Sequence, residues 1–222
     1  MNYYHLLVYL LLSYLGGTLN PAWFIAHIKG FDIRKTGSGN AGGSNALITM
    51  GGKIGLFCML FDVFKAFFIV RLALWMFSGI VYAGAASAVC CILGHIFPFY
   101  MGFKGGKGLA CIGGSAMALT PIIFFVLFGV ALLVSFVLDY ICYVPTGAVI
   151  VYPVIYGLFT GSVLCGLVFL PVTLVVLMKH RENFQRIKDG TEAHFSFIWK
   201  RNEEMERLTG GEDADMDVEI QK

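Results

Sequence analysis

The stretch PIIFFVLFGVALLVSFVL, from Pro121 to Leu138, decides the class of this protein. It lies in a segment, residues 108–138, that contains no Asp, Glu, Lys or Arg, and a second such segment covers residues 140–178. An apolar stretch of about 20 residues is enough to cross the hydrocarbon core of a bilayer as a helix. Both segments are longer than this, so the sequence predicts a polytopic membrane protein.

The composition excludes an ordinary soluble domain. The 222 residues are 58% hydrophobic and 14% charged, with a mean hydropathy of +0.76, whereas a soluble domain carries roughly 25% charged residues. Ten-residue segments of alternating hydrophobicity, typical of membrane strands, are absent from the sequence. Helices satisfy their own backbone hydrogen bonds in lipid, so we expect an all-α transmembrane bundle.

Apolar segments separated by polar loops predict between five and seven helices. Residues 109–119 are too short to cross a bilayer alone, and residues 144–178 are long enough for two short or tilted helices. The other expected spans are residues 3–26, with Gly16, Gly17 and Pro21 as kink points, and residues 54–77, 80–97 and 121–138.

The positions of the basic residues predict the orientation. Apart from Lys65 and Arg71, every Lys and Arg lies in one of two polar loops or after Met178. The positive-inside rule puts these three regions in the cytoplasm and the N-terminus outside. Residues 210–222 are acidic and without aromatic residues, which predicts a disordered tail after a membrane domain of residues 1–209.

The six cysteines all lie in apolar segments and lack the spacing of metal ligands. We interpret them as packing residues, and we expect no metal site and no disulfide framework.

Three polar segments need a functional explanation. The first is TGSGNAGGSN (36–45), in which glycines let backbone N–H groups converge on an anion and Ser38, Asn40, Ser44 and Asn45 offer side-chain donors. The second is GHIFPFYMGFKGGKG (94–108), with Lys104 and Lys107 beside two glycines. The third is HRENFQRIKDGTE (180–192), directly after an apolar span.

Each segment also has a plain structural interpretation. They could be a loose solvent loop, a pair of interfacial lysines meeting lipid headgroups, and a solvated interfacial helix. His95 could be a satisfied core histidine. Asp62 and Lys65, three residues apart in one span, share a helix face and predict either a functional site within the membrane or a structural ion pair.

Together, cationic or Gly-rich loops on one membrane face predict an anion site at the lipid surface. In order and spacing, these segments and DVFK (62–65) resemble the motifs of the bacterial acyl-phosphate:glycerol-3-phosphate acyltransferases. The resemblance covers the chain to Glu192. It implies seven helices, the N-terminus outside, and an active site on the cytoplasmic face of the bacterial inner membrane.

The resemblance also implies the reaction and its residues. A fatty acyl group passes from acyl-phosphate to glycerol 3-phosphate. The resemblance implies that the enzyme acts in the lipid bilayer, binds no nucleic acid, and uses no metal or organic cofactor. The family pattern implies catalytic roles for Ser38, His180 and Asn183. It implies substrate or phosphate binding by Gly37, Gly39, Asn40, Gly42, Ser44, Asn45, Lys104, Gly106, Lys107 and Glu192.

The chain departs from the family pattern most clearly at Ile48, where the family has an arginine that binds substrate phosphate. We expect weakened binding of glycerol 3-phosphate unless Arg34, Lys35 or Lys53 compensates. Smaller departures are Gly43 and Ser44 in place of Ala-Thr, and Ala66 in place of glycine. Two alternatives are an inactive relative that binds lipid or a partner, and an anion or lipid transporter with broken helices.

Overall fold

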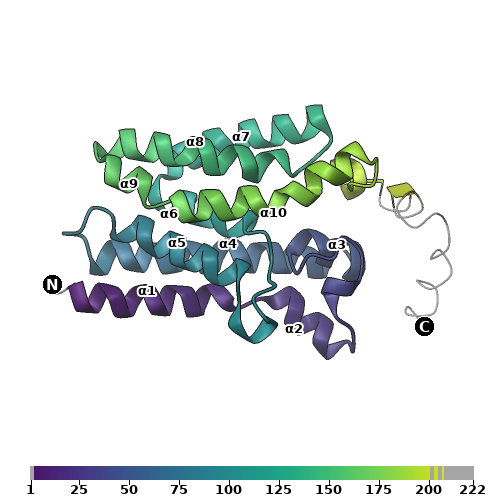
Figure 1. The fold of residues 1–222 in the computed structure, drawn as a ribbon, viewed down its shortest axis with the longest axis horizontal. Coiled ribbons are helices and arrows are strands. Elements are labelled where there is room, and N and C mark those ends of the chain that lie inside the picture. Colours follow the sequence, from purple (N-terminus) through teal and green to yellow (C-terminus); the bar gives the residue numbers. More distant parts are fainter. Residues whose placement is uncertain (1–2, 201–202, 205–206, 208–222) are drawn as a thin grey trace.

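The structure, a computed structural model, describes residues 3–200, 203–204 and 207, so the predicted acidic tail lies outside the described residues. The regular secondary structure of the described part is helical (Figure 1). The α-helices are α1 (Tyr3–Thr18), α2 (Pro21–Ile28), α3 (Gly43–Met50), α4 (Gly52–Met76), α5 (Ala83–Ile96), α6 (Leu109–Leu119), α7 (Pro121–Leu138), α8 (Tyr143–Thr160), α9 (Val163–Leu167) and α10 (Leu170–Lys188). Short 3-10 helices cover Ile33–Lys35, Phe99–Met101 and Phe195–Ile198.

The predicted membrane character is confirmed. By length and composition, the described residues form four segments able to cross a membrane, or five if the bent pair of α1 and α2 is one span. The four are Ala83–Met101, Pro121–Leu138, Tyr143–Thr160 and Val163–Lys188. The implied number of seven helices across the membrane and the outer position of the N-terminus stay predictions.

The first predicted span is two helices. α1 and α2 meet at a bend of 42°, at the Pro21 kink point that the sequence indicated. Pro21 occupies the first turn of α2, where its missing N–H removes no helical hydrogen bond. The Asn20 side chain accepts a hydrogen bond from the Trp23 N–H and so caps α2.

α4 is the central helix of the lower layer in Figure 1, and it packs against both α5 and α6. α1 packs against α5 and also contacts α4, while α7, α8 and α10 form the upper layer. Small residues permit the tightest contacts: a Cβ added to Gly114 of α6 would lie 2.1 Å from the Val63 carbonyl oxygen of α4. Close packing of this kind stabilises membrane helices, because burial from lipid supplies little driving force.

We therefore predict that Gly114→Ala lowers the midpoint of thermal unfolding in detergent. The added methyl group overlaps a backbone atom, and overpacking costs about 1–3 kcal/mol. The matched control is Gly129→Ala in α7, where an added Cβ meets nothing within 4 Å. That variant should unfold at the same temperature as the parent or slightly higher, since alanine is the better helix former. Equal midpoints for the two variants would contradict the proposed packing.

Candidate active site

A cavity of about 340 Å³ lies among α3, α4, α6, α7 and α10. Polar residues of all three predicted segments line it: Ser38, Asn40, Ser44, Lys107, His180, Asn183 and Glu192. Much of the remaining wall is apolar, and α7 supplies a large part of it with Phe124, Phe128, Ala131 and Leu132. The cavity therefore combines a polar part for charged groups with an apolar part for a hydrocarbon chain.

The side chain of Asn45 holds the first loop in shape through hydrogen bonds to its backbone. Its fully buried side chain accepts a hydrogen bond from the Ser38 N–H (2.8 Å) and donates to the carbonyls of Ile33 (2.9 Å) and Thr36 (3.0 Å). Gly37 has a φ of +56°, and a Cβ there would lie 2.3 Å from Asn45 Oδ1. Gly37 and Asn45 are outside the cavity wall and hold Ser38 at it.

The sequence predicted that N–H groups of the first loop converge on an anion, but the N–H groups of Ser38 and Gly39 are already bonded within the protein. The Ser38 N–H is bonded to Asn45, and the Gly39 N–H donates to the Thr36 carbonyl (3.0 Å). The loop instead leads into the N-terminus of α3, where Gly42 is the N-cap and lines the cavity together with Gly43 and Ser44. First-turn N–H groups lack helical partners and carry a partial positive charge, which favours an anion.

A hydrogen-bonded chain joins the second and third segments. Lys107 Nζ donates to Asn183 Oδ1, and Asn183 Nδ2 donates to Glu192 Oε1 (2.5 Å). Glu192 Oε2 accepts from Arg186 Nε at 2.7 Å. Asn183 and Glu192 are both buried. The carboxylate thus fixes the Asn183 amide, which in turn holds the Lys107 ammonium in the cavity wall.

Burial, followed by the positive charge of Arg186, lowers the pKa of Lys107 to about 8. The ammonium is therefore mostly charged at neutral pH and loses its proton in mildly alkaline solution. A partly desolvated cation attracts an anion more strongly than a solvated one does.

His180 is buried in the cavity wall. Its Nδ1 lies 2.8 Å from the Val176 carbonyl oxygen, which can only accept, so the neutral ring carries its proton on Nδ1. Nε2 is then the ring atom that can accept a hydrogen bond from a substrate hydroxyl.

Several predicted residues lie outside the cavity wall. Lys104 is exposed, and its implied role in binding an anion stays a prediction. The Gly106 N–H donates to the His95 carbonyl (3.2 Å) and so fixes the turn before Lys107. Gly39, described above, likewise supports the first loop from outside the wall.

Ile48 on α3 lines the cavity and is 6% exposed. Arg34, which could have compensated for the family arginine, bonds to Asp32 (2.8 Å) and to the Met101 carbonyl (2.7 Å). Lys35 and Lys53 are exposed. Of the residues that the structure describes, Lys107 is the single lysine or arginine in the cavity wall.

The predicted Asp62–Lys65 ion pair is present, with Lys65 Nζ 2.6 Å from Asp62 Oδ1. Asp62 and His95 both reach the cavity wall, a position that the sequence analysis did not assign to them. The i, i+3 spacing signalled the pair, but nothing local in the sequence placed His95 beside it. Asp62, His95 and Cys111 bring possible metal ligands within 4.8 Å of one another, yet the Lys65 ammonium already neutralises the carboxylate.

Comparisons with known proteins identify the family of the chain. The sequence model of the family described as "Glycerol-3-phosphate acyltransferase" matches residues 7–190. The glycerol-3-phosphate acyltransferase of Thermosipho melanesiensis is 35% identical over 84% of this chain and 91% of its own length. That of Bacillus subtilis is 32% identical over 85% of this chain and 97% of its own.

Two solved structures are also similar. Both are of PlsY, an integral membrane glycerol 3-phosphate acyltransferase. Its glycerol 3-phosphate form has a TM-score of 0.80 and 28% identity, covering 87% of this chain and 97% of its own. The lysophosphatidic acid form has a TM-score of 0.76 and 27% identity, covering 86% and 95%. The chain therefore belongs to the glycerol-3-phosphate acyltransferase family. It is an integral membrane enzyme.

Proposed function

We propose that the chain transfers a fatty acyl group from acyl-phosphate to the first hydroxyl of glycerol 3-phosphate. The products are lysophosphatidic acid and inorganic phosphate. The observation that carries the proposal is the cavity, in which Lys107 and the N-terminus of α3 lie in the same wall as an apolar surface. A donor with an acyl chain and a phosphate needs both surfaces, and the acceptor needs a second anion site.

The proposed mechanism relies on positioning. Acyl-phosphate is already activated, and holding two reactants in line can lower a bimolecular barrier by roughly 7–11 kcal/mol. The glycerol hydroxyl attacks the acyl carbonyl carbon, the bond from that carbon to the phosphate oxygen breaks, and the departing phosphate takes the hydroxyl proton. His180 Nε2 accepts the hydrogen bond of the attacking hydroxyl and relays its single proton to the departing phosphate, and donors in the cavity wall stabilise the oxyanion.

We place this reaction in the bacterial inner membrane, on its cytoplasmic face, within a catalytic domain of residues 1–209. The positive-inside rule supports the face, since Lys107 and the basic end of α10 border the cavity. The proposed reaction needs neither a metal nor an organic cofactor, because acyl-phosphate is already activated and phosphate is a good leaving group.

The direct test is to purify the protein in detergent, supply acyl-phosphate with labelled glycerol 3-phosphate, and measure labelled lysophosphatidic acid. Acyl carrier protein and coenzyme A thioesters serve as alternative donors. Product from a thioester but none from acyl-phosphate would overturn the proposed donor. Failure with every donor would favour the alternative of an inactive relative.

The two lysines of the second segment form a matched pair. We predict that Lys107→Met lowers kcat/KM at least tenfold, because one hydrogen bond to a charged group contributes about 1.5–3 kcal/mol. Lys104→Met should lower it less, since Lys104 is exposed and outside the cavity wall. Both variants should insert like the parent, and Lys107→Met should unfold at a somewhat lower temperature, because the buried Asn183 Oδ1 loses its donor. A larger loss from Lys104→Met would show that the second loop binds the anion differently.

The pKa of Lys107, about 8, predicts a pH dependence. kcat/KM reports the free enzyme, so it should fall as pH rises through about 8, where the ammonium loses its proton. Lys107→Arg keeps its charge throughout this range, and its kcat/KM should stay level to higher pH. An unchanged profile in the arginine variant would assign the alkaline limb to another group.

Ile48 provides a test of the acceptor site. We predict that Ile48→Arg lowers the KM for glycerol 3-phosphate roughly ten- to a hundredfold, from about 1.5–3 kcal/mol for a charged hydrogen bond. The KM for acyl-phosphate should change less. Ile48→Met, similar in volume to the native residue and uncharged, is the control. If Ile48→Arg binds the acceptor no better, another group already holds its phosphate or the natural acceptor is a different molecule.

A further inference from the structure

Part of the cavity wall comes from residues beyond the family match, which ends at residue 190. Ala193, Phe195 and Phe197 line the cavity, and all three belong to residues 193–200, here named the C-terminal strap. Phe195 and Phe197 are 7% and 6% exposed. The strap therefore supplies a part of the cavity wall that the matched region does not.

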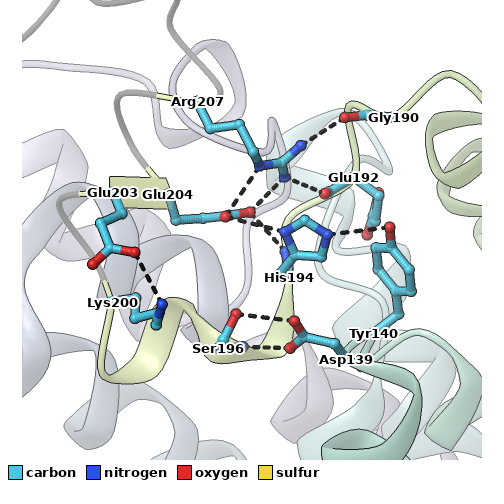
Figure 2. Close-up of polar contacts among 10 residues, drawn as sticks. All are labelled: Asp139, Tyr140, Gly190, Glu192, His194, Ser196, Lys200, Glu203, Glu204 and Arg207. Atoms are coloured by element: carbon cyan, nitrogen blue, oxygen red, sulfur yellow. Dashed lines mark hydrogen bonds and ion pairs between the residues drawn. The ribbon is translucent and has the colours of Figure 1, made fainter.

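Asp139 fastens the strap to the end of α7 (Figure 2). Its carboxylate accepts hydrogen bonds from the Ser196 N–H (2.7 Å) and the Ser196 hydroxyl (3.0 Å). Its carbonyl accepts from the Phe195 N–H at 2.6 Å. Asp139 is also the one charged residue in the stretch 108–178. Hydrogen bonds to a carboxylate are stronger than those between neutral groups, so the strap has a defined position.

Aromatic packing supports this fastening. The ring of Phe195 meets that of Phe136 edge-on, with centroids 5.3 Å apart, and Trp199 stacks on Phe136 at 5.8 Å. Phe136 lies on α7, the same helix that supplies Phe128 and Leu132 to the apolar wall. The strap is thus continuous with the apolar part of the cavity.

A second set of contacts holds the beginning of the strap, at His194 and the residues just before it. Glu204 accepts from the His194 N–H (2.8 Å), and its carboxylate is paired with Arg207. Arg207 also donates to the carbonyls of Gly190 and Glu192, each at 2.6 Å (Figure 2). Phe197 therefore lies between Ser196, which bonds to Asp139, and Trp199, which stacks on Phe136.

We infer that the C-terminal strap sets the length of the acyl chain that the cavity accepts, and that Phe197 is the side chain that limits it. The inference rests on the proposed use of an acyl-phosphate donor. Phe195 is committed to the aromatic contacts that anchor the strap. Phe197 is the other large side chain that the strap presents to the cavity, so its size determines how much of the cavity a chain can fill.

The test compares the parent with Phe197→Ala, Phe197→Trp and Ile198→Ala, using saturated acyl-phosphates that differ in steps of two carbons. Each buried methylene is worth about a fourfold change in affinity. Phe197→Ala should therefore shift the preference in kcat/KM toward longer chains by up to about fifteenfold per two-carbon step, and Phe197→Trp should shift it toward shorter ones. Ile198 is 51% exposed and outside the cavity wall, so Ile198→Ala should keep the parent profile.

A second readout separates this inference from the proposed function. Unreactive alkyl phosphates of the same chain lengths are added to each purified variant, and the rise in unfolding temperature is measured. The parent protein could fail to turn over acyl-phosphate while the variants still shift the chain-length profile in this assay. That result would support the role of the strap in chain length and overturn acyl-phosphate as the donor. Conversely, the parent could turn over acyl-phosphate while all folded variants share one chain-length profile in both assays. That result would overturn the role of the strap in chain length and leave acyl-phosphate as the proposed donor.

Discussion

The fold depends on the buried ammonium of Lys65. Charged groups at membrane depth require partners, and Lys65 has three of them, on different parts of the chain. It lies 2.6 Å from Asp62 on α4 and 3.2 Å from His95 Nδ1 on α5, and it donates to the Leu19 carbonyl. Leu19 lies between α1 and α2, where the break in the helix leaves carbonyls without helical partners. One cation thus satisfies the broken span and joins it to two other helices.

The same cluster reaches the active site through the backbone. The His95 carbonyl accepts from the Gly106 N–H, and the Ile96 carbonyl accepts from the Gly105 N–H at 3.0 Å. These two bonds set the direction of the chain immediately before Lys107. The C-terminal end of α5 therefore fixes the direction in which the second segment turns, and Lys107 follows directly after that turn.

The sequence predicted the helices well where local signals determine their ends. α7 has the predicted bounds, because Pro121 fits a first helical turn and Asp139 adopts a left-handed conformation (φ 56°) that ends the helix. α6 also begins and ends as predicted. The position of the break between α1 and α2 was indicated by Pro21, but the Lys65 ammonium that bonds to the Leu19 carbonyl there lies more than 40 residues away in the sequence.

The candidate site was less predictable from sequence. Lys104 and Lys107 flank the same two glycines, and only the tertiary bonds of the turn distinguish the lysine in the cavity from the exposed one. The segment 193–200 carried no polar motif, so nothing local in the sequence connected Phe197 with a cavity. Its role depends on Asp139, more than 50 residues away in the sequence.

Glu192 connects the two parts of the cavity. Its carboxylate bonds to Asn183 and Arg186, and so fixes the partner of the Lys107 ammonium. Its carbonyl accepts from Arg207 at 2.6 Å, which ties the same residue to the contacts that hold the strap. A displacement of the strap therefore has a short bonded path to the anion site. Buried hydrogen-bond networks of this kind act as units, so the contacts of Lys107 and those that hold the strap meet at a single residue, Glu192.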